Sequence, residues 1–209
     1  GTETLGDFPA EDGTGIAGAG VGMLGAFAGT ITFDLTDGDP VNDVPAGVMV
    51  KQVILYWEGQ HKTTNGDADI TVNGGPVTGT LIGGPTDFFM SGGEMVKSSS
   101  YRALLPTSLI TPGATSTISL AGFDGFYKSN GAGILVIFDD GTGAATIVVR
   151  DGNDLAWDGF LAGDSRKICE KQVFNFAAAP EPTDRAGNIV MFASSVENPR
   201  PHTLTVEID

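Results

Sequence analysis

The segment of residues 131–154 constrains the fold most, because it joins two β-prone apolar runs through an acidic, glycine-containing turn. Residues 134–138 are continuously apolar, a pattern typical of a strand that is buried on both faces. Apolar residues resume at 146–149, after the turn at residues 139–143. The segment therefore predicts a β-hairpin near the centre of an all-β domain.

Short runs of β-branched and aromatic residues recur along the rest of the chain, with turn residues between them. The 209 residues include 31 glycines and 11 prolines, which is too many for a helical protein, and no segment keeps a helical period for long. We expect strands at residues 29–35, 48–57, 68–73, 77–82, 101–105, 116–121, 132–138, 145–150, 168–176, 188–193 and 202–208. Short strands in this number predict a β-sandwich of jelly-roll type, with a closed barrel as the alternative topology.

An unusual uncharged segment lies near the start of the chain. Residues 13–33 carry no charge, and seven of the first 17 are glycine. Such a segment makes a poor helix, and no Lys or Arg flanks it, so a membrane span is not expected. We expect residues 1–28 to form an extended, Gly/Ala-rich N-terminal arm and residues 29–209 to form a single sandwich domain.

An extended arm has two different faces, one with a row of apolar side chains and one that is mainly glycine. The apolar row consists of Ala17, Ala19, Val21, Met23 and Phe27. We predict that this row contacts a neighbouring subunit, because an extended segment can add as a strand to an open sheet edge. The alternative is that the segment pairs within its own domain as the first strand.

The formal net charge of -15 limits the range of partners, because it repels phosphate backbones and anionic membrane surfaces. Nucleic acid is therefore not an expected partner. Cys169 is the only cysteine, which excludes an internal disulfide but not export. Because Cys169 lies in the β-prone run of residues 168–176, we expect it to be a buried core residue.

The sequence offers little for catalysis. A Ser, Thr or Cys nucleophile needs a base, and the two histidines are His61 in a polar loop and His202 on the apolar face of the last predicted strand. Glu58, directly after Trp57, is the best candidate for glycoside hydrolysis, but nothing in the sequence provides its partner carboxylate. We therefore expect that the protein is not an enzyme.

Two acidic turns are candidate calcium sites. His and Cys spacings typical of zinc sites are absent, whereas calcium needs only carboxylate, amide and carbonyl oxygens. The candidate ligands are Asp34, Asp37 and Asp39 in the first turn, and Asp151, Asn153 and Asp154 in the second. The alternative is that these residues form ordinary Asx turns at strand ends.

Two tryptophans are candidates for glycan stacking. Binding of a sugar face requires only an exposed ring and a few polar neighbours. The candidates are Trp57, at the end of a predicted strand, and Trp157, in an acidic loop.

Several motifs occur in the same order in a known group of proteins. They are VKQVILYW at residues 50–57, TVNGGPVTGTLIG at residues 71–83, the pair Tyr101-Arg102, and GAGILVIFDDG with IVVRDGND within residues 131–154. On these motifs the chain resembles exported bacterial and archaeal proteins, often with a cell-surface anchor, that include the uncharacterised domain DUF3344. The resemblance spans residues 29–195 and implies an exported β-sandwich without any identified catalytic residue.

The chain departs from these relatives at one place. They often have a Cys-Trp pair where this chain has Phe88 and Phe89, so the disulfide that the resemblance implies there is absent. The combined expectation is a non-enzymatic extracellular or cell-surface structural protein, a subunit of a filament or matrix layer assembled by strand addition. The alternative is a carbohydrate-binding adhesion module.

Overall fold

The computed structural model describes residues 1–62, 66–143, 145–177, 187–196 and 203–207. Their regular elements are strands and three single-turn 3-10 helices. The strands are β1 (Gly6–Phe8), β2 (Gly15–Gly22), β3 (Ala28–Phe33), β4 (Met49–His61), β5 (Asp69–Val72), β6 (Gly75–Thr78), β7 (Thr80–Ser91), β8 (Glu94–Leu105), β9 (Ser116–Ala121), β10 (Lys128–Asp139) and β11 (Val149–Asp151). The short helices are η1 (Pro40–Asn42), η2 (Thr107–Leu109) and η3 (Ser165–Lys167).

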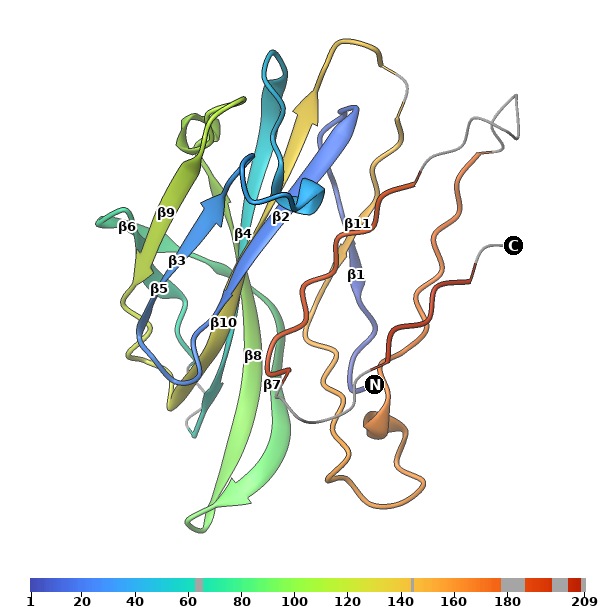
Figure 1. The fold of residues 1–209 in the computed structure, drawn as a ribbon. Helices are drawn as coiled ribbons and strands as arrows, with labels where there is room; N and C mark the ends of the chain where they lie inside the picture. Colours follow the sequence, from blue (N-terminus) through green and yellow to red (C-terminus); the bar gives the residue numbers. More distant parts are fainter. Residues whose placement is uncertain (63–65, 144, 178–186, 197–202, 208–209) are drawn as a thin grey trace.

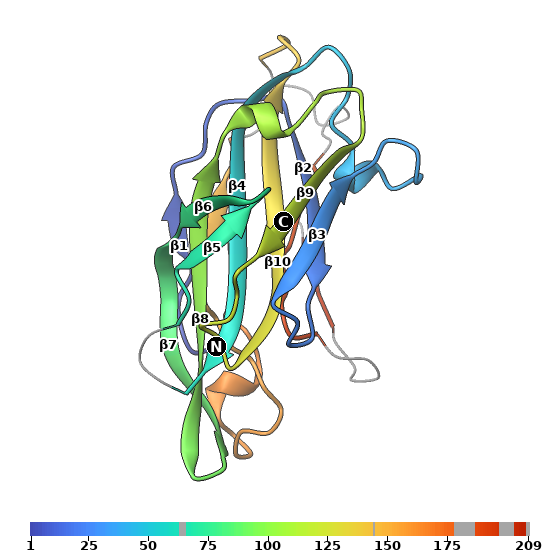
Figure 2. The same cartoon turned by 90° about the vertical axis from the view of Figure 1, so that its left-hand side faces the viewer.

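Two antiparallel sheets stack face to face (Figures 1 and 2). The larger sheet has five strands in the order β2-β10-β4-β8-β7, and the smaller has four in the order β3-β9-β5-β6. The all-β sandwich predicted from the sequence is confirmed. No helix in the described parts of the chain has the length and apolar character needed to cross a membrane.

The strands pair in a nested order. Strand β2 pairs with β10, β3 with β9, β4 with β8 and β5 with β6, and every pair is antiparallel. Strands β2, β3, β4 and β5 lie alternately in the larger and the smaller sheet. Their partners β10, β9, β8 and β6 alternate in the same way. Strand β7 lies outside this nested order, because it pairs with β8 at the edge of the larger sheet.

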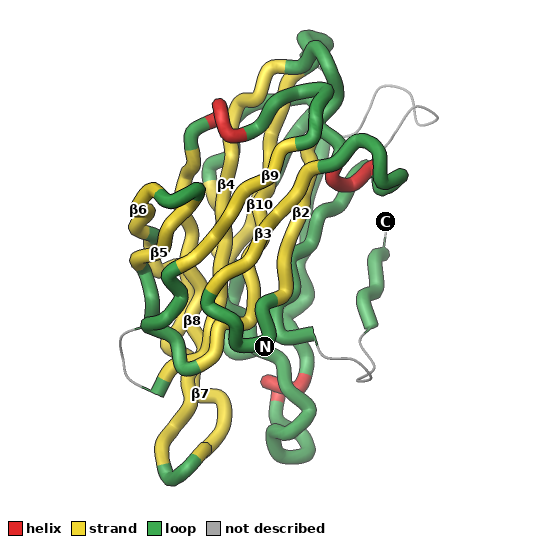
Figure 3. The backbone as a smooth tube through the Cα atoms, turned by 60° about the vertical axis from the view of Figure 1, so that its left-hand side comes forward, coloured by secondary structure: helices red, strands yellow, loops and turns green. Residues whose placement is uncertain are grey.

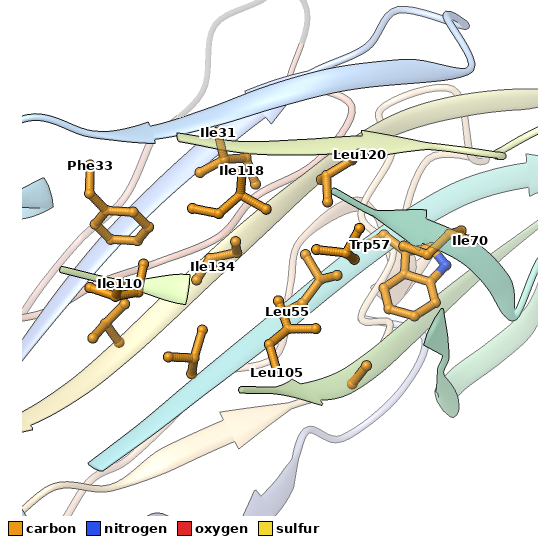
Figure 4. Close-up of a cluster of buried hydrophobic side chains, with 14 of the residues drawn as sticks. Ile31, Phe33, Leu55, Trp57, Ile70, Leu105, Ile110, Ile118, Leu120 and Ile134 are labelled. Carbon is orange, nitrogen blue, oxygen red and sulfur yellow. The ribbon is translucent and has the colours of Figure 1, made fainter. Parts of the chain in front are cut away.

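The main core lies between the two sheets (Figure 4). Leu55 and Trp57 of β4 and Ile134 of β10 project into it from the larger sheet, and Ile31 and Ile118 project from the smaller one. The two-residue alternation of a strand places these side chains on one face. Burial of this face is the main source of stability for the sandwich.

The larger sheet is also covered on its outer face. A second apolar cluster there contains Ile54 of β4, Leu135 and Ile137 of β10, and Val149 of β11. The continuous apolar run at residues 134–138 is therefore buried on both faces, as predicted.

The predicted hairpin at residues 131–154 is wrong. Strand β11 pairs with β1 in a separate two-stranded sheet, and β10 pairs with β2 and β4. Because both edges of β10 are occupied, the chain after its turn crosses to the outer face instead of returning beside β10.

The segment predicted as an N-terminal arm belongs to the sandwich. Strand β2 pairs with β10 over its whole length, and Ala17 and Met23 are buried in the main core. Residues 1–28 are therefore not a separate arm in this structure, and the alternative of a strand within its own domain applies. Part of the apolar row that was predicted to contact a neighbouring subunit packs within this subunit. Ala19 and Val21 lie against the main core, whereas Phe27 is exposed.

The three strands predicted after residue 165 are also wrong. Residues 168–177, 187–196 and 203–207, called here the C-terminal segments, carry no strand assignment and run as loop beside the sandwich (Figure 3). Positions 202 and 208 of the last predicted strand lie outside the described residues. Strands β1 and β11 and residues 187–196 lie on the outer face of the larger sheet, and residues 168–177 and 203–207 run farther out; these segments together are called here the outer layer.

Candidate interaction surface

Glycines on the outer face of the larger sheet allow the outer layer to approach its backbone. A Cβ atom on Gly18 of β2 would overlap Val190, and a Cβ on Gly133 of β10 would overlap the ring of Phe192. The Phe192 ring also lies 5.9 Å from the ring of Tyr56. Residues 187–196 therefore pack directly on Gly18 and Gly133, which are called here the glycine platform.

A polar network fastens the outer layer beside this platform. Asn153 Oδ1 accepts hydrogen bonds from Ser98 Oγ at 3.0 Å and Ser100 Oγ at 2.9 Å, and Asn153 Nδ2 donates to the Ser98 carbonyl at 3.1 Å. Glu3 accepts from the Gly84 amide at 2.6 Å and from the Asn153 amide at 3.3 Å. The network is largely buried, so each partner stabilises the fold by satisfying the others.

Glu58 belongs to the same network. Its carboxylate accepts hydrogen bonds from Ser98 Oγ at 2.7 Å, from Asn130 Nδ2 at 2.7 Å and from Ser194 Oγ. This carboxylate therefore holds residues 187–196 against the sheet, and the structure gives it no catalytic partner among these contacts. The sequence signal for the network was the Ser98–Ser100 run, where three hydroxyl residues occur in a row within a strand.

The candidate calcium ligands of the second acidic turn are also structural. Asp154 accepts hydrogen bonds from the amides of Thr2 at 2.6 Å and Glu170 at 2.7 Å. Asp151 pairs with the Arg102 guanidinium at 2.5 Å. These donors bind the carboxylate oxygens that would otherwise coordinate a cation. The Arg102 pair also ties β11 to β8.

The first acidic turn consists of Asx turns. Asp34 accepts from the amide and hydroxyl of Thr36, which lowers the pKa of its carboxyl. Asp37 accepts from the Asp39 amide at 2.8 Å, and Asp39 caps η1 by accepting from the Val41 amide at 3.0 Å. No group of three His, Cys, Asp or Glu side chains that could hold a metal occurs within the described ranges. The geometry is that of the Asx-turn alternative.

Trp57 is not available for glycan stacking. Its side chain is 2% exposed, its ring stacks on Tyr101 with centroids 5.6 Å apart, and its Nε1 donates to the Asp67 carbonyl at 2.8 Å. The interpretation of Trp57 as an exposed strand end is wrong because β4 continues to His61.

Trp157 lies in a half-buried aromatic cluster. Its ring centroid is 5.0 Å from Phe88, 6.0 Å from Phe89 and 5.3 Å from Phe160. The cluster joins the loop that carries Trp157 to β7. In that loop the Arg166 guanidinium holds the pKa of Asp164 to about 2.

A Ser-His contact in the described part of the chain is enclosed. His61 Nε2 lies 2.8 Å from Ser99 Oγ, but His61 is 1% exposed and Ser99 is fully buried. A nucleophile must reach its substrate, so this pair acts as a core hydrogen bond. His61 ends β4 and does not lie in a polar loop as predicted, and His202 lies outside the described residues.

Exposed apolar side chains gather on the C-terminal segments. These are Ile168, Val173, Phe174, Phe176, Ile189, Met191, Phe192, Val196, Leu204 and Val206. Within the described ranges, no backbone-to-backbone hydrogen bond joins residues 169–177, 187–196 or 203–207 to another segment. The C-terminal segments thus combine a β-prone sequence and exposed apolar groups with a backbone that, in the ranges just given, makes no backbone-to-backbone hydrogen bond to another segment.

Side-chain contacts hold these segments in place. Thr4 Oγ1 donates to Glu170 at 2.8 Å, and the Arg150 guanidinium lies 4.8 Å from the centre of the Phe174 ring. An ion pair of 2.8 Å joins Lys171 to Glu207. Contacts of this kind between exposed groups are individually weak.

Cys169 is exposed, so the prediction of a buried core thiol is wrong. It lies in the outer layer, where no further sheet covers it. Partial desolvation and the Asp154 carboxylate raise the pKa of the thiol.

We expect a maleimide to modify Cys169 in the native protein, because the side chain is accessible. The reactive species is the thiolate, so the rate should keep rising with pH beyond about 8.5, the ordinary pKa of a cysteine thiol. Mass spectrometry of timed samples at several pH values measures the rate, with the guanidinium-unfolded protein as the control. Modification confined to the unfolded protein would show that the thiol is shielded.

Comparison with known proteins gives no relative. No protein-family model matches the chain, no curated protein is significantly similar to it, and no solved structure matches its fold.

Proposed function

We propose that this chain is a non-enzymatic structural subunit that associates with copies of itself, as part of an extracellular or cell-surface filament or matrix layer. The observation that carries the proposal is the set of C-terminal segments, which expose apolar side chains and, over residues 169–177, 187–196 and 203–207, make no backbone-to-backbone hydrogen bond to another segment. Large exposed apolar patches and open β-prone backbone mark association surfaces in soluble proteins. The cell-surface location rests on the resemblance to exported proteins alone.

A second copy can contact the C-terminal segments without bringing charged groups together. Their exposed apolar side chains carry no charge in a chain whose net charge is -15. Contact through an uncharged surface avoids the repulsion between two acidic subunits, although the rest of the charge still opposes approach. Association should therefore be strongest where salt screens that charge.

We expect the average mass of the protein to rise with its concentration, and to rise further as NaCl increases to roughly 1 M, where the Debye length is about 3 Å. Sedimentation velocity and multi-angle light scattering across a dilution series measure this, and electron micrographs of the concentrated sample show the form of the product. A protein that stays monomeric at every concentration and salt level would overturn the proposal.

The alternative is a carbohydrate-binding adhesion module. Of its two candidate stacking residues, Trp57 is buried and cannot contact a glycan. Only Trp157 remains half-exposed, and three aromatic rings pack around it. Saturable glycan binding by a monomer that never associates would favour this alternative.

A further inference from the structure

The two sheets of the sandwich differ by one strand. The larger sheet ends in β7, whereas the smaller sheet ends in β6, a strand of only four residues that pairs with β5 on one side. The register of the β5–β6 hairpin, with Val72 opposite Gly75, places the backbone of Pro76 and Thr78 toward the open edge of β6. The smaller sheet can therefore accept a further strand at this edge.

An apolar groove of about 250 Å³ lies at the same edge. Val72 and Val77 line it from the smaller sheet, and Leu105, Pro106 and Leu109 line it from β8 and η2. No charged side chain lines the groove. It suits an extended segment with small to medium apolar side chains on one face.

Residues 203–207 have that pattern. Leu204 and Val206 share one face of the extended segment, and Thr203, Thr205 and Glu207 occupy the other. Leu204 is 60% exposed and Val206 is 55% exposed. Among the described residues, a surface ion pair between Glu207 and Lys171 ties this segment to the rest of the chain.

The other two C-terminal segments are held more firmly. Residues 187–196 pack through Val190 and Phe192 on the glycine platform, and residues 168–177 are tied by Glu170 and Phe174. Among the three C-terminal segments, residues 203–207 therefore lose the fewest described contacts when they detach from the rest of the subunit.

We infer that residues 203–207 of one copy dock in the groove beside β6 of a second copy and add a fifth strand to its smaller sheet. Leu204 and Val206, about 7 Å apart along a strand, enter the groove, while the threonines and Glu207 face solvent. Because Pro76 has no N–H to donate, apolar contacts contribute more to this docking than backbone hydrogen bonds. The inference rests on the proposed self-association and specifies how it occurs.

The groove and the donor segment lie on opposite sides of the molecule. Figure 1 shows β6 at one side of the larger sheet and residues 203–207, the last coloured part of the chain, at the other. A segment and groove placed in this way join different copies head to tail, and such a contact continues into an open polymer unless the rotation closes a ring.

Two variants test the inference. L204D/V206D removes the apolar face of the donor, and V77D places a charge in the groove; each alone should leave the protein monomeric under conditions where the wild type associates. An equimolar mixture of the two variants should form dimers and no larger oligomers. The donor of V77D can dock in the groove of L204D/V206D, whereas the other donor and the other groove in that dimer are both disabled. The control I189D/M191D removes two exposed apolar side chains from a different segment and should associate like the wild type.

Cross-linking tests the same contact without relying on the stability of V77D. In a Cys169→Ala background, Val77→Cys combined with Val206→Cys should give a ladder of disulfide-linked oligomers on a non-reducing gel. Normal association of L204D/V206D, or loss of association in I189D/M191D, would overturn the docking mode while leaving self-association intact. Failure of the wild type to associate would instead overturn the proposed function.

Discussion

Replacing Trp57 by alanine should lower the free energy of unfolding by about 3–5 kcal/mol, the range found for large aromatic side chains removed from a core. Trp57 is 2% exposed, and its ring fills the space between Tyr101 and Gly79. The substitution also leaves the buried Asp67 carbonyl without the indole donor that lies 2.8 Å from it. Urea denaturation followed by circular dichroism measures the loss.

Trp57→Phe is the matched control. It keeps an aromatic ring against Tyr101 but cannot donate to the Asp67 carbonyl, so it should cost about 1–2 kcal/mol, the effect of one unmade buried hydrogen bond and a small cavity. Equal losses in the two variants would mean that the hydrogen bond, and not the packing of the ring, holds this part of the core.

Replacing Gly84 by alanine should cost about 2–4 kcal/mol, because two independent effects add. Gly84 has a φ of +84°, a conformation that L side chains rarely adopt, and a Cβ there would overlap the Ser98 carbonyl oxygen of the neighbouring strand. A shift of the backbone would also disturb the amide that donates to Glu3 at 2.6 Å. The loss is measured by denaturation as for Trp57.

Gly93 separates the two effects. It also has a φ of +84°, but a Cβ on it would meet nothing within 4 Å. Gly93→Ala should therefore cost only the conformational term, about 1–2 kcal/mol. A loss at Gly84 no larger than at Gly93 would show that the sheet moves to accept the methyl group.

Local pattern was enough to predict some strands of the sandwich but missed β2, most of β7 and the first half of β8. The run at residues 116–121 coincides with β9, because Ser116, Ile118 and Leu120 alternate onto the core. The run at residues 134–138 was correctly predicted to be buried on both faces. These features depend on side chains within a few residues, which is what a sequence displays.

Pairing partners could not be predicted in the same way. Residues 15–22 have the pattern of an extended strand whether they pair with β10 or with another copy. The β-prone run at residues 168–176 reads like a buried strand, yet its residues carry no strand assignment and Cys169 is exposed. Trp57 and Trp157 each precede an acidic residue, and their burial differs because one lies in a central strand and the other in a loop. Such outcomes depend on contacts between residues far apart in the chain.

The nested pairing of the strands has a consequence for the time course of synthesis. Gly22 pairs with Gly131, so β2 leaves the ribosome long before its partner exists, and β10 must then enter between β2 and β4. Sandwiches that depend on such distant pairs fold slowly. An unpaired strand is exposed to wrong partners in this interval, and segments rich in glycine are poor templates for aggregation. We therefore expect the glycine content of β2 to limit aggregation of the nascent chain until β10 has been made.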